Sequence, residues 1–248
     1  MFLNSLSLMG VRHHKVGLPF IITILFLNSC TSAYDKLEED MILIPAGTFL
    51  SGSVSEGADP DEGPVREVFV ESFSLSKIEV TQKLWRSVMR YNPSVHKGDD
   101  YPVEAVSYYD ALLFIQKLNK LTGKNYRLPT ETEWEYVASQ GADIYETNLD
   151  DFAWYLSNSD SVSHICATKA PNPFGVYDIV GNVHEWCYGI YDGCDYDGRQ
   201  VNKLDALVEE AVFRGGAFNC ERKYCRISNR NHFDANLQNY AVGFRIAE

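Results

Sequence analysis

Residues 214–230 read RGGAFNCERKYCRISNR and combine a glycine pair, two cysteines and regularly spaced arginines. Gly215 and Gly216 predict a place where the backbone turns sharply or passes close to another chain, because glycine has no Cβ. Cys220 and Cys225 can meet if the residues between them fold into a loop. The two thiols would then close a small disulfide or present two soft sulfur ligands to one metal ion. Both alternatives stay open, and the choice between them decides whether the protein is an enzyme.

The rest of the chain has the composition of one globular domain. It contains 248 residues, of which 45% are hydrophobic and 13% aromatic. This length is ample for a sizeable core, and the chain shows no internal repeat or low-complexity tract. The formal net charge of −12 argues against nucleic acid as a partner, because phosphates require a basic surface.

The first thirty residues predict export and a lipid anchor. A basic segment at 12–15 precedes a short apolar run at 18–27, which ends in Leu27-Asn28-Ser29-Cys30. This ending resembles a bacterial lipoprotein cleavage box, so we expect a signal peptide over 1–29 and acylation of Cys30. The alternative is an ordinary secretory signal with a stray cysteine. We expect an acidic tether over 30–40, and a cell-envelope protein held on the periplasmic face or outer surface through its lipid anchor alone.

Removing the signal peptide would change both the charge and the cysteine count. The mature chain would carry a net charge of −14, from 20 basic and 34 acidic residues. Lipidation of Cys30 would leave an odd number of cysteines: Cys166, Cys187, Cys194, Cys220 and Cys225. At least one thiol would then stay free, bind a metal or pair between chains, while Cys187 and Cys194 are near enough in sequence to bridge.

Local patterns predict an α+β fold with little regular secondary structure. We expect strands near 41–44 and 48–49 and a half-buried strand pair over 65–78. Helices should begin after Thr81, Ser107 and Thr130, with Gly123 ending the second and Glu133 completing a capping box in the third. Beyond Gly141 we expect mainly loops, with short strands near 212–214, 224–228 and 242–246.

An ordered set of motifs resembles the formylglycine-generating enzyme (sulfatase-modifying factor) family. The motifs are MILIPAGTF (41–49), DEGPV (61–65), IEVT (78–81), YPV (101–103), VS (106–107), RLPTE (127–131), EWEY (133–136), NPFGVYD (172–178), GNVHEW (181–186), RGG (214–216) and GFR (243–245). The resemblance covers residues 41–248 and implies one domain with a variant of the C-type lectin fold.

The resemblance also implies a copper-dependent oxidase. Catalytic members hold copper(I) between two cysteines that match Cys220 and Cys225, and Tyr224 matches as well. They oxidise a cysteine of a sulfatase-type peptide to formylglycine with O₂. This chain departs from them at Ala217, where they have serine, and at His184, where they usually have tryptophan. Glu221 replaces a histidine of some members, and its charge could raise the pKa of the neighbouring thiol.

A calcium site is the second metal site that the resemblance implies. The matching residues are the side chains of Asp178 and Glu185 and the backbone carbonyls of Gly181 and Val183. Oxygen donors of this kind suit a hard cation. The alternative is that Asp178 and Glu185 only form hydrogen bonds that hold the loops.

Two function classes remain. The first is an anchored oxidase of the formylglycine-generating type, with Cys220, Cys225 and Tyr224 at its site and a cysteine-containing peptide as substrate. The second is a non-catalytic, lectin-like surface lipoprotein that binds a protein or glycan. Glu131, Glu133 and Glu135 are expected to have a structural role at the start of their helix, and the four tryptophans are expected in the core.

Overall fold

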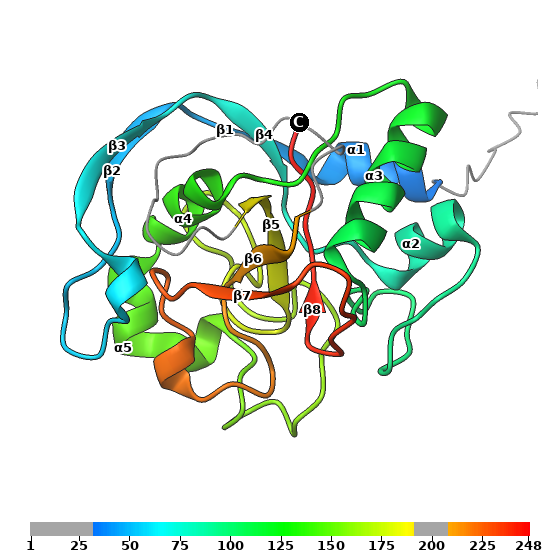
Figure 1. Ribbon diagram of the computed structural model, residues 1–248. Helices are drawn as coiled ribbons and strands as arrows, with labels where there is room; N and C mark the ends of the chain where they lie inside the picture. Colours follow the sequence, from blue (N-terminus) through cyan, green and yellow to red (C-terminus); the bar gives the residue numbers. More distant parts are fainter. Residues whose placement is uncertain (1–31, 191–207) are drawn as a thin grey trace, which may run out of the picture. The chain divides into compact units, whose positions relative to one another are not determined.

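The structure is a computed structural model and describes residues 32–190 and 208–248, which combine helices with three small sheets (Figure 1). The helices of this described part are α1 (Ala33–Asp40), α2 (Gln82–Met89), α3 (Tyr108–Thr122), α4 (Glu131–Ser139) and α5 (Ala142–Phe152), with 3₁₀ turns η1 (Pro60–Glu62) and η2 (Arg222–Tyr224). Its strands are β1 (Met41–Ile44), β2 (Gly47–Ser51), β3 (Arg66–Val70), β4 (Phe73–Ser76), β5 (His184–Ile190), β6 (Glu210–Arg214), β7 (Asn231–Asp234) and β8 (Val242–Gly243).

The helix boundaries predicted from capping residues are confirmed. Thr81, Ser107 and Thr130 are the N-caps of α2, α3 and α4, and the side chain of each accepts a backbone N–H from the first turn. Gly123 ends α3 in the left-handed conformation, with φ of 74°. Each cap satisfies backbone groups that the helix itself leaves without partners.

The predicted strands at the start of the domain form, but the two strands expected as a pair over 65–78, β3 and β4, do not pair with each other. β1 pairs with β4 and β2 pairs with β3, both antiparallel, so the chain runs out along one ribbon and returns along it. The third sheet has the order β7-β6-β5-β8, in which β5 and β8 are parallel. This sheet carries Arg214, and the glycine pair follows directly from its β6 strand.

Two hydrophobic clusters form on opposite faces of β5. Trp186 belongs to a cluster with α2 and α3, where Trp85 stacks on Phe114 with 5.2 Å between ring centroids. Cys187 points the other way, into a cluster with α4 and α5 that includes Trp134. Figure 1 shows these two helix pairs on either side of the sheet. The clusters hold β5 and the end of β6 in place from both sides.

Several segments differ from the sequence-based expectation. Residues 33–40, expected as part of a tether, form α1 because Ser32 caps the helix and Leu37 is buried against the core. α5 forms where only loops were expected, with a kink at Asn148. Residues 224–228 form no strand, because 222–224 turn as η2. Trp154 is only partly buried and stacks on His164 at 3.7 Å, so it is not a core tryptophan.

Within the described ranges, no helix has the length and apolar character needed to cross a membrane. Cys30 and the predicted signal peptide lie outside the described residues, as does Cys194, the cysteine that is near enough in sequence to bridge Cys187.

Candidate functional site

The glycine pair turns the chain sharply at the end of β6. Gly215 and Gly216 have φ of 100° and 73°, in the region that favours glycine. A Cβ at 216 would lie 2.7 Å from the sulfur of Cys225, and a Cβ at 215 would lie 3.0 Å from the Ile179 carbonyl oxygen. The predicted sharp turn is therefore confirmed, and the segments that lie close to the two glycines belong to the same chain.

Arg214 links this turn to α4. Its guanidinium is fully buried and contacts Glu131 at 3.0 Å and Glu135 at 2.9 Å. It also donates hydrogen bonds to the carbonyl oxygens of Ile227 and Ser228, at 2.9 and 3.2 Å. Glu131 and Glu135 have the structural role that was expected. They form ion pairs with Arg214, in addition to the expected interaction with the dipole at the start of α4.

The three spaced arginines fasten the rest of the loop to three different elements. Arg222 donates to the carbonyl oxygens at 145 and 146 of α5, at 3.2 and 2.7 Å. Arg226 donates to the carbonyl oxygen of Gly57, at 2.6 Å, and pairs with Glu62. Arg230 pairs with Glu131 of α4, at 2.7 Å. These side chains position the loop that carries both cysteines.

Both cysteines of the loop are free thiols with different surroundings. Cys225 is 3% exposed and packs with the α4–α5 cluster, and burial, with a smaller contribution from Cys220, raises its pKa to about 12. Cys220 is more exposed, and burial raises its pKa as well. Glu221 is not the cause, because it forms an ion pair with Lys223 at 3.1 Å on the surface.

His184 contacts the Cys220 thiol directly. The distance from Cys220 Sγ to His184 Nε2 is 3.3 Å. Burial lowers the pKa of His184 to about 4, so the imidazole is neutral at physiological pH. A hydrogen bond with the Arg214 backbone opposes this lowering of the pKa but is the smaller effect. The sequence shows that His184 departs from the residue usual in the family, but its contact with Cys220 could not be predicted from the sequence.

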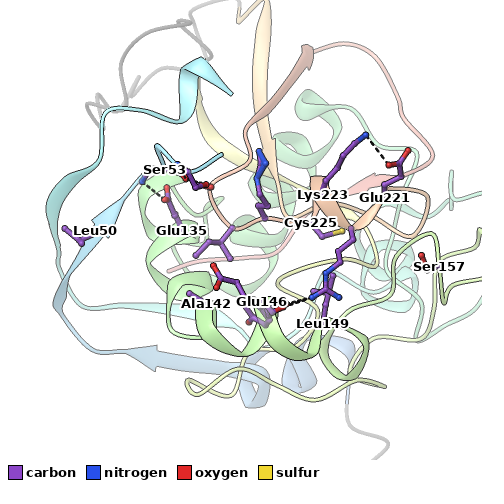
Figure 2. Close-up of a pocket in the computed structure, with 17 residues that line it drawn as sticks. Leu50, Ser53, Glu135, Ala142, Glu146, Leu149, Ser157, Glu221, Lys223 and Cys225 are labelled. Carbon is purple, nitrogen blue, oxygen red and sulfur yellow. Dashed lines mark hydrogen bonds and ion pairs between the residues drawn. The ribbon is translucent and has the colours of Figure 1, made fainter. Parts of the chain in front are cut away.

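A cavity of about 830 Å³ lies beside the loop (Figure 2). Leu50, Leu149, Ile227 and Cys225 give it apolar walls, while charged side chains from 221–226 and from α5 line it as well. Of the three residues predicted as catalytic, Cys225 belongs to the lining, whereas Cys220 and Tyr224 do not. Tyr224 is 43% exposed, and the Lys223 ammonium lies 4.8 Å from the centroid of its ring.

The two carboxylates predicted to bind calcium differ in whether their oxygens already have partners. Asp178 is buried, its Oδ2 accepts the Ala167 N–H at 2.6 Å, and its Oδ1 has no partner among the described residues. Both oxygens of Glu185 are bound by Arg245 at 2.6 Å. Glu79 is a residue that sequence reasoning missed: it is 1% exposed, and its Oε2 also lacks a partner in the described chain.

The Asp178 carboxylate acts electrostatically on Glu79. The pKa of Glu79 is raised by burial and by Asp178, and burial raises the pKa of Asp178 to about 6. A carboxylate inside the IEVT motif was the only sequence signal for Glu79. Two buried oxygens without partners fit a hard cation, whereas Glu185 is already neutralised by Arg245. In the described part of the chain, no three His, Cys, Asp or Glu side chains converge as a metal site.

Comparison with known proteins places this arrangement in a family. The sequence profile of the "Sulfatase-modifying factor enzyme 1-like domain" matches residues 29–248. The chain belongs to the sulfatase-modifying factor family. The solved structures of Treponema denticola variable protein 1 and of PvdO from Pseudomonas aeruginosa are similar, each at 27% identity over 84% of this chain. Their TM-scores are 0.71 and 0.70, over 94% and 93% of those chains, so the predicted fold class is confirmed.

Relatives within the sulfatase-modifying factor family have different names and activities. The chain is 30% identical to the chaperone protein LppX of Paenibacillus barcinonensis, over 65% of this chain and 76% of that protein. It is 23% identical to the formylglycine-generating enzyme of Thermomonospora curvata, over 86% and 94%. It is 25% identical to the inactive C-alpha-formylglycine-generating enzyme 2 of Bos taurus, over 64% and 74%. Membership in the family therefore does not by itself assign an activity.

Proposed function

We propose that this protein is an oxidase of the formylglycine-generating type, acting on a cysteine in a sulfatase-type peptide. The observation that supports this most is the pair of free thiols, Cys220 and Cys225, in one loop beside a cavity. Thiolates are soft ligands that favour copper(I), so these two residues would hold the ion. Copper would supply the activation of O₂.

The overall reaction balances with one further reactant. The substrate side chain, CH₂SH, loses two electrons and two protons to become a thioaldehyde. A thiol reductant supplies two more electrons and protons, so that O₂ is reduced to two water molecules and the reductant becomes a disulfide. Hydrolysis of the thioaldehyde then releases hydrogen sulfide and leaves the aldehyde of formylglycine.

The residues of this chain position the metal ligands and the substrate. The arginine contacts fix the loop, and Gly216 leaves the space that the Cys225 sulfur occupies. The apolar wall formed by Leu50, Leu149 and Ile227 would bind the peptide next to Cys225 and exclude water. Both thiols have raised pKa values, so metal binding would have to displace their protons.

A second candidate function is a non-catalytic binding module for a protein or glycan. One observation favours it: Ala217 is buried and offers no hydroxyl where catalytic members have serine. Under this function the same cavity would bind a partner without chemical change.

One experiment separates the two functions. The purified full chain, reduced and loaded with Cu(I), is incubated in air with a reductant and a peptide containing Cys-x-Pro-x-Arg. We expect the peptide mass to change as CH₂SH is replaced by CHO, and we expect Cys220→Ala and Cys225→Ala to abolish this change. Cys166→Ala is the matched control, because Cys166 is also a buried thiol but lies outside the loop. An unmodified peptide with Cu(I) bound would favour the binding module.

Calcium and the lipid anchor belong to the same proposal. Asp178, with Glu79, would hold a structural calcium ion, since each has a buried oxygen without a partner among the described residues. Acylation of Cys30 would attach the protein to the cell envelope, and it is tested by metabolic labelling with a fatty acid. Loss of the label in Cys30→Ala is the expected result, and an unlabelled parent protein would contradict the anchor.

A further inference from the structure

His184 and Cys220 are held together by two separately fixed segments. His184 lies on β5, and the next residue of that strand pairs with Arg214 of β6. The imidazole is 8% exposed and packs edge-on against Phe213, with 4.8 Å between the ring centroids. Cys220 lies in the loop that the arginines fasten. The 3.3 Å contact between them therefore belongs to the framework of the site and is not a chance approach of two mobile side chains.

We propose that His184 is a ligand of the same metal ion as Cys220, giving a mixed nitrogen and sulfur site for copper(I). This inference rests on the function proposed above. The geometric reason is the direction of the contact: Nε2, not Nδ1, faces the sulfur. If Nε2 accepts the thiol proton in a hydrogen bond, an ion that replaces this proton lies between sulfur and nitrogen. Imidazole and thiolate both suit copper, whereas the indole of the tryptophan usual at this position has no lone pair to donate.

A third ligand for the metal ion would have to be added to Cys220 and His184. No three His, Cys, Asp or Glu side chains converge in the described residues, so Cys220 and His184 form a pair of donors. Cys225 is near enough to influence Cys220 electrostatically, and a substrate thiol would enter from the cavity that Cys225 lines. The substrate sulfur can complete the site, and the Cys225 sulfur can do so only if its side chain moves toward the other two donors. His184 and Cys220 would then hold the ion together before substrate binds.

The test uses binding and spectroscopy of the full chain. Cu(I) affinity is measured by competition with a chromogenic Cu(I) chelator, and X-ray absorption at the copper edge identifies the ligand atoms. His184→Phe keeps the ring contact with Phe213 and removes both nitrogens. His164→Phe is the matched control, because it replaces a histidine stacked on Trp154 outside this site. We expect His184→Phe to weaken binding more than about 100-fold, since loss of an outer partner alone costs about 10–100-fold.

The wild-type spectrum should show imidazole nitrogen together with sulfur, and the nitrogen signal should be absent in His184→Phe. Copper bound by sulfur alone in the wild type, or unchanged affinity in His184→Phe, would overturn the inference. In that case peptide oxidation by the wild type would leave the proposed function intact. If the wild type binds no Cu(I), both fail together. Should His184→Phe not fold, His184→Trp, which carries the residue usual in catalytic relatives, replaces it, and the wild-type spectrum remains decisive.

Discussion

Replacing Gly216 by alanine should destabilise the protein by about 2–5 kcal/mol. One part of this cost is the backbone, because φ is 73° and an L-residue loses about 1–2 kcal/mol in the left-handed conformation. The other part is overpacking, since the new Cβ would lie 2.7 Å from the Cys225 sulfur and 3.1 Å from the Tyr224 carbonyl oxygen. Forcing an extra carbon into a packed site typically costs about 1–3 kcal/mol.

Gly175→Ala separates the two contributions. Gly175 has a similar φ of 82°, but a Cβ there would meet no described atom within 4 Å. Urea denaturation of the two variants should show a cost of about 1–2 kcal/mol for Gly175→Ala and a larger one for Gly216→Ala. In a Cys225→Ala background the sulfur contact is gone, so the extra cost at 216 should shrink. Equal destabilisation of the two glycine variants would refute the close approach of residue 216 to Cys225.

Three further changes test the framework around the loop. Arg214→Met leaves the Glu135 carboxylate buried without its cation, so the free energy of unfolding should fall by about 3–5 kcal/mol; a change within 1 kcal/mol would contradict this burial. Thr130→Ala removes the cap of α4 and should cost about 1 kcal/mol in the same assay, while Thr130→Ser should retain most of it. Added calcium should raise the melting temperature of the metal-free protein, and Asp178→Asn or Glu79→Gln should reduce that rise. If both variants respond to calcium as the wild type does, the ion binds elsewhere.

Local chemistry accounts for the parts of the fold that the sequence predicts well. The caps at Ser107 and Thr130 depend on residues three positions apart, so the sequence contains all the information they need. The glycine pair is similar, since two adjacent glycines after an apolar strand leave few backbone alternatives. The fold class was predicted from the family motifs, because these identify a known tertiary structure and local patterns do not.

Contacts between distant segments account for what the sequence did not predict. β5 is buried on both faces and therefore lacks the alternation by which a half-buried strand is recognised. The contact between Cys220 and His184 joins residues 36 positions apart, and the hydrogen bond between Asn182 and Glu79 spans 103. Neither pairing follows from spacing or residue type. The ion pairs of the arginines with α4 and with the loop at 57–62 are equally invisible until the chain is folded.

In the loop at 222–230, arginines that hold the backbone are separated by residues of the candidate site. This arrangement affects how the function of related sequences can change. Arg222, Arg226 and Arg230 hold the loop from outside, while Tyr224 and Cys225 lie between them and contribute to none of these attachments. A substitution at an intervening position can therefore change the reactivity of the loop while the arginine contacts to α4 and α5 stay in place. In such a segment the reactive residues can change during evolution while the arginines that hold the loop are retained. One frame can thus support an oxidase, an inactive relative and a binding protein.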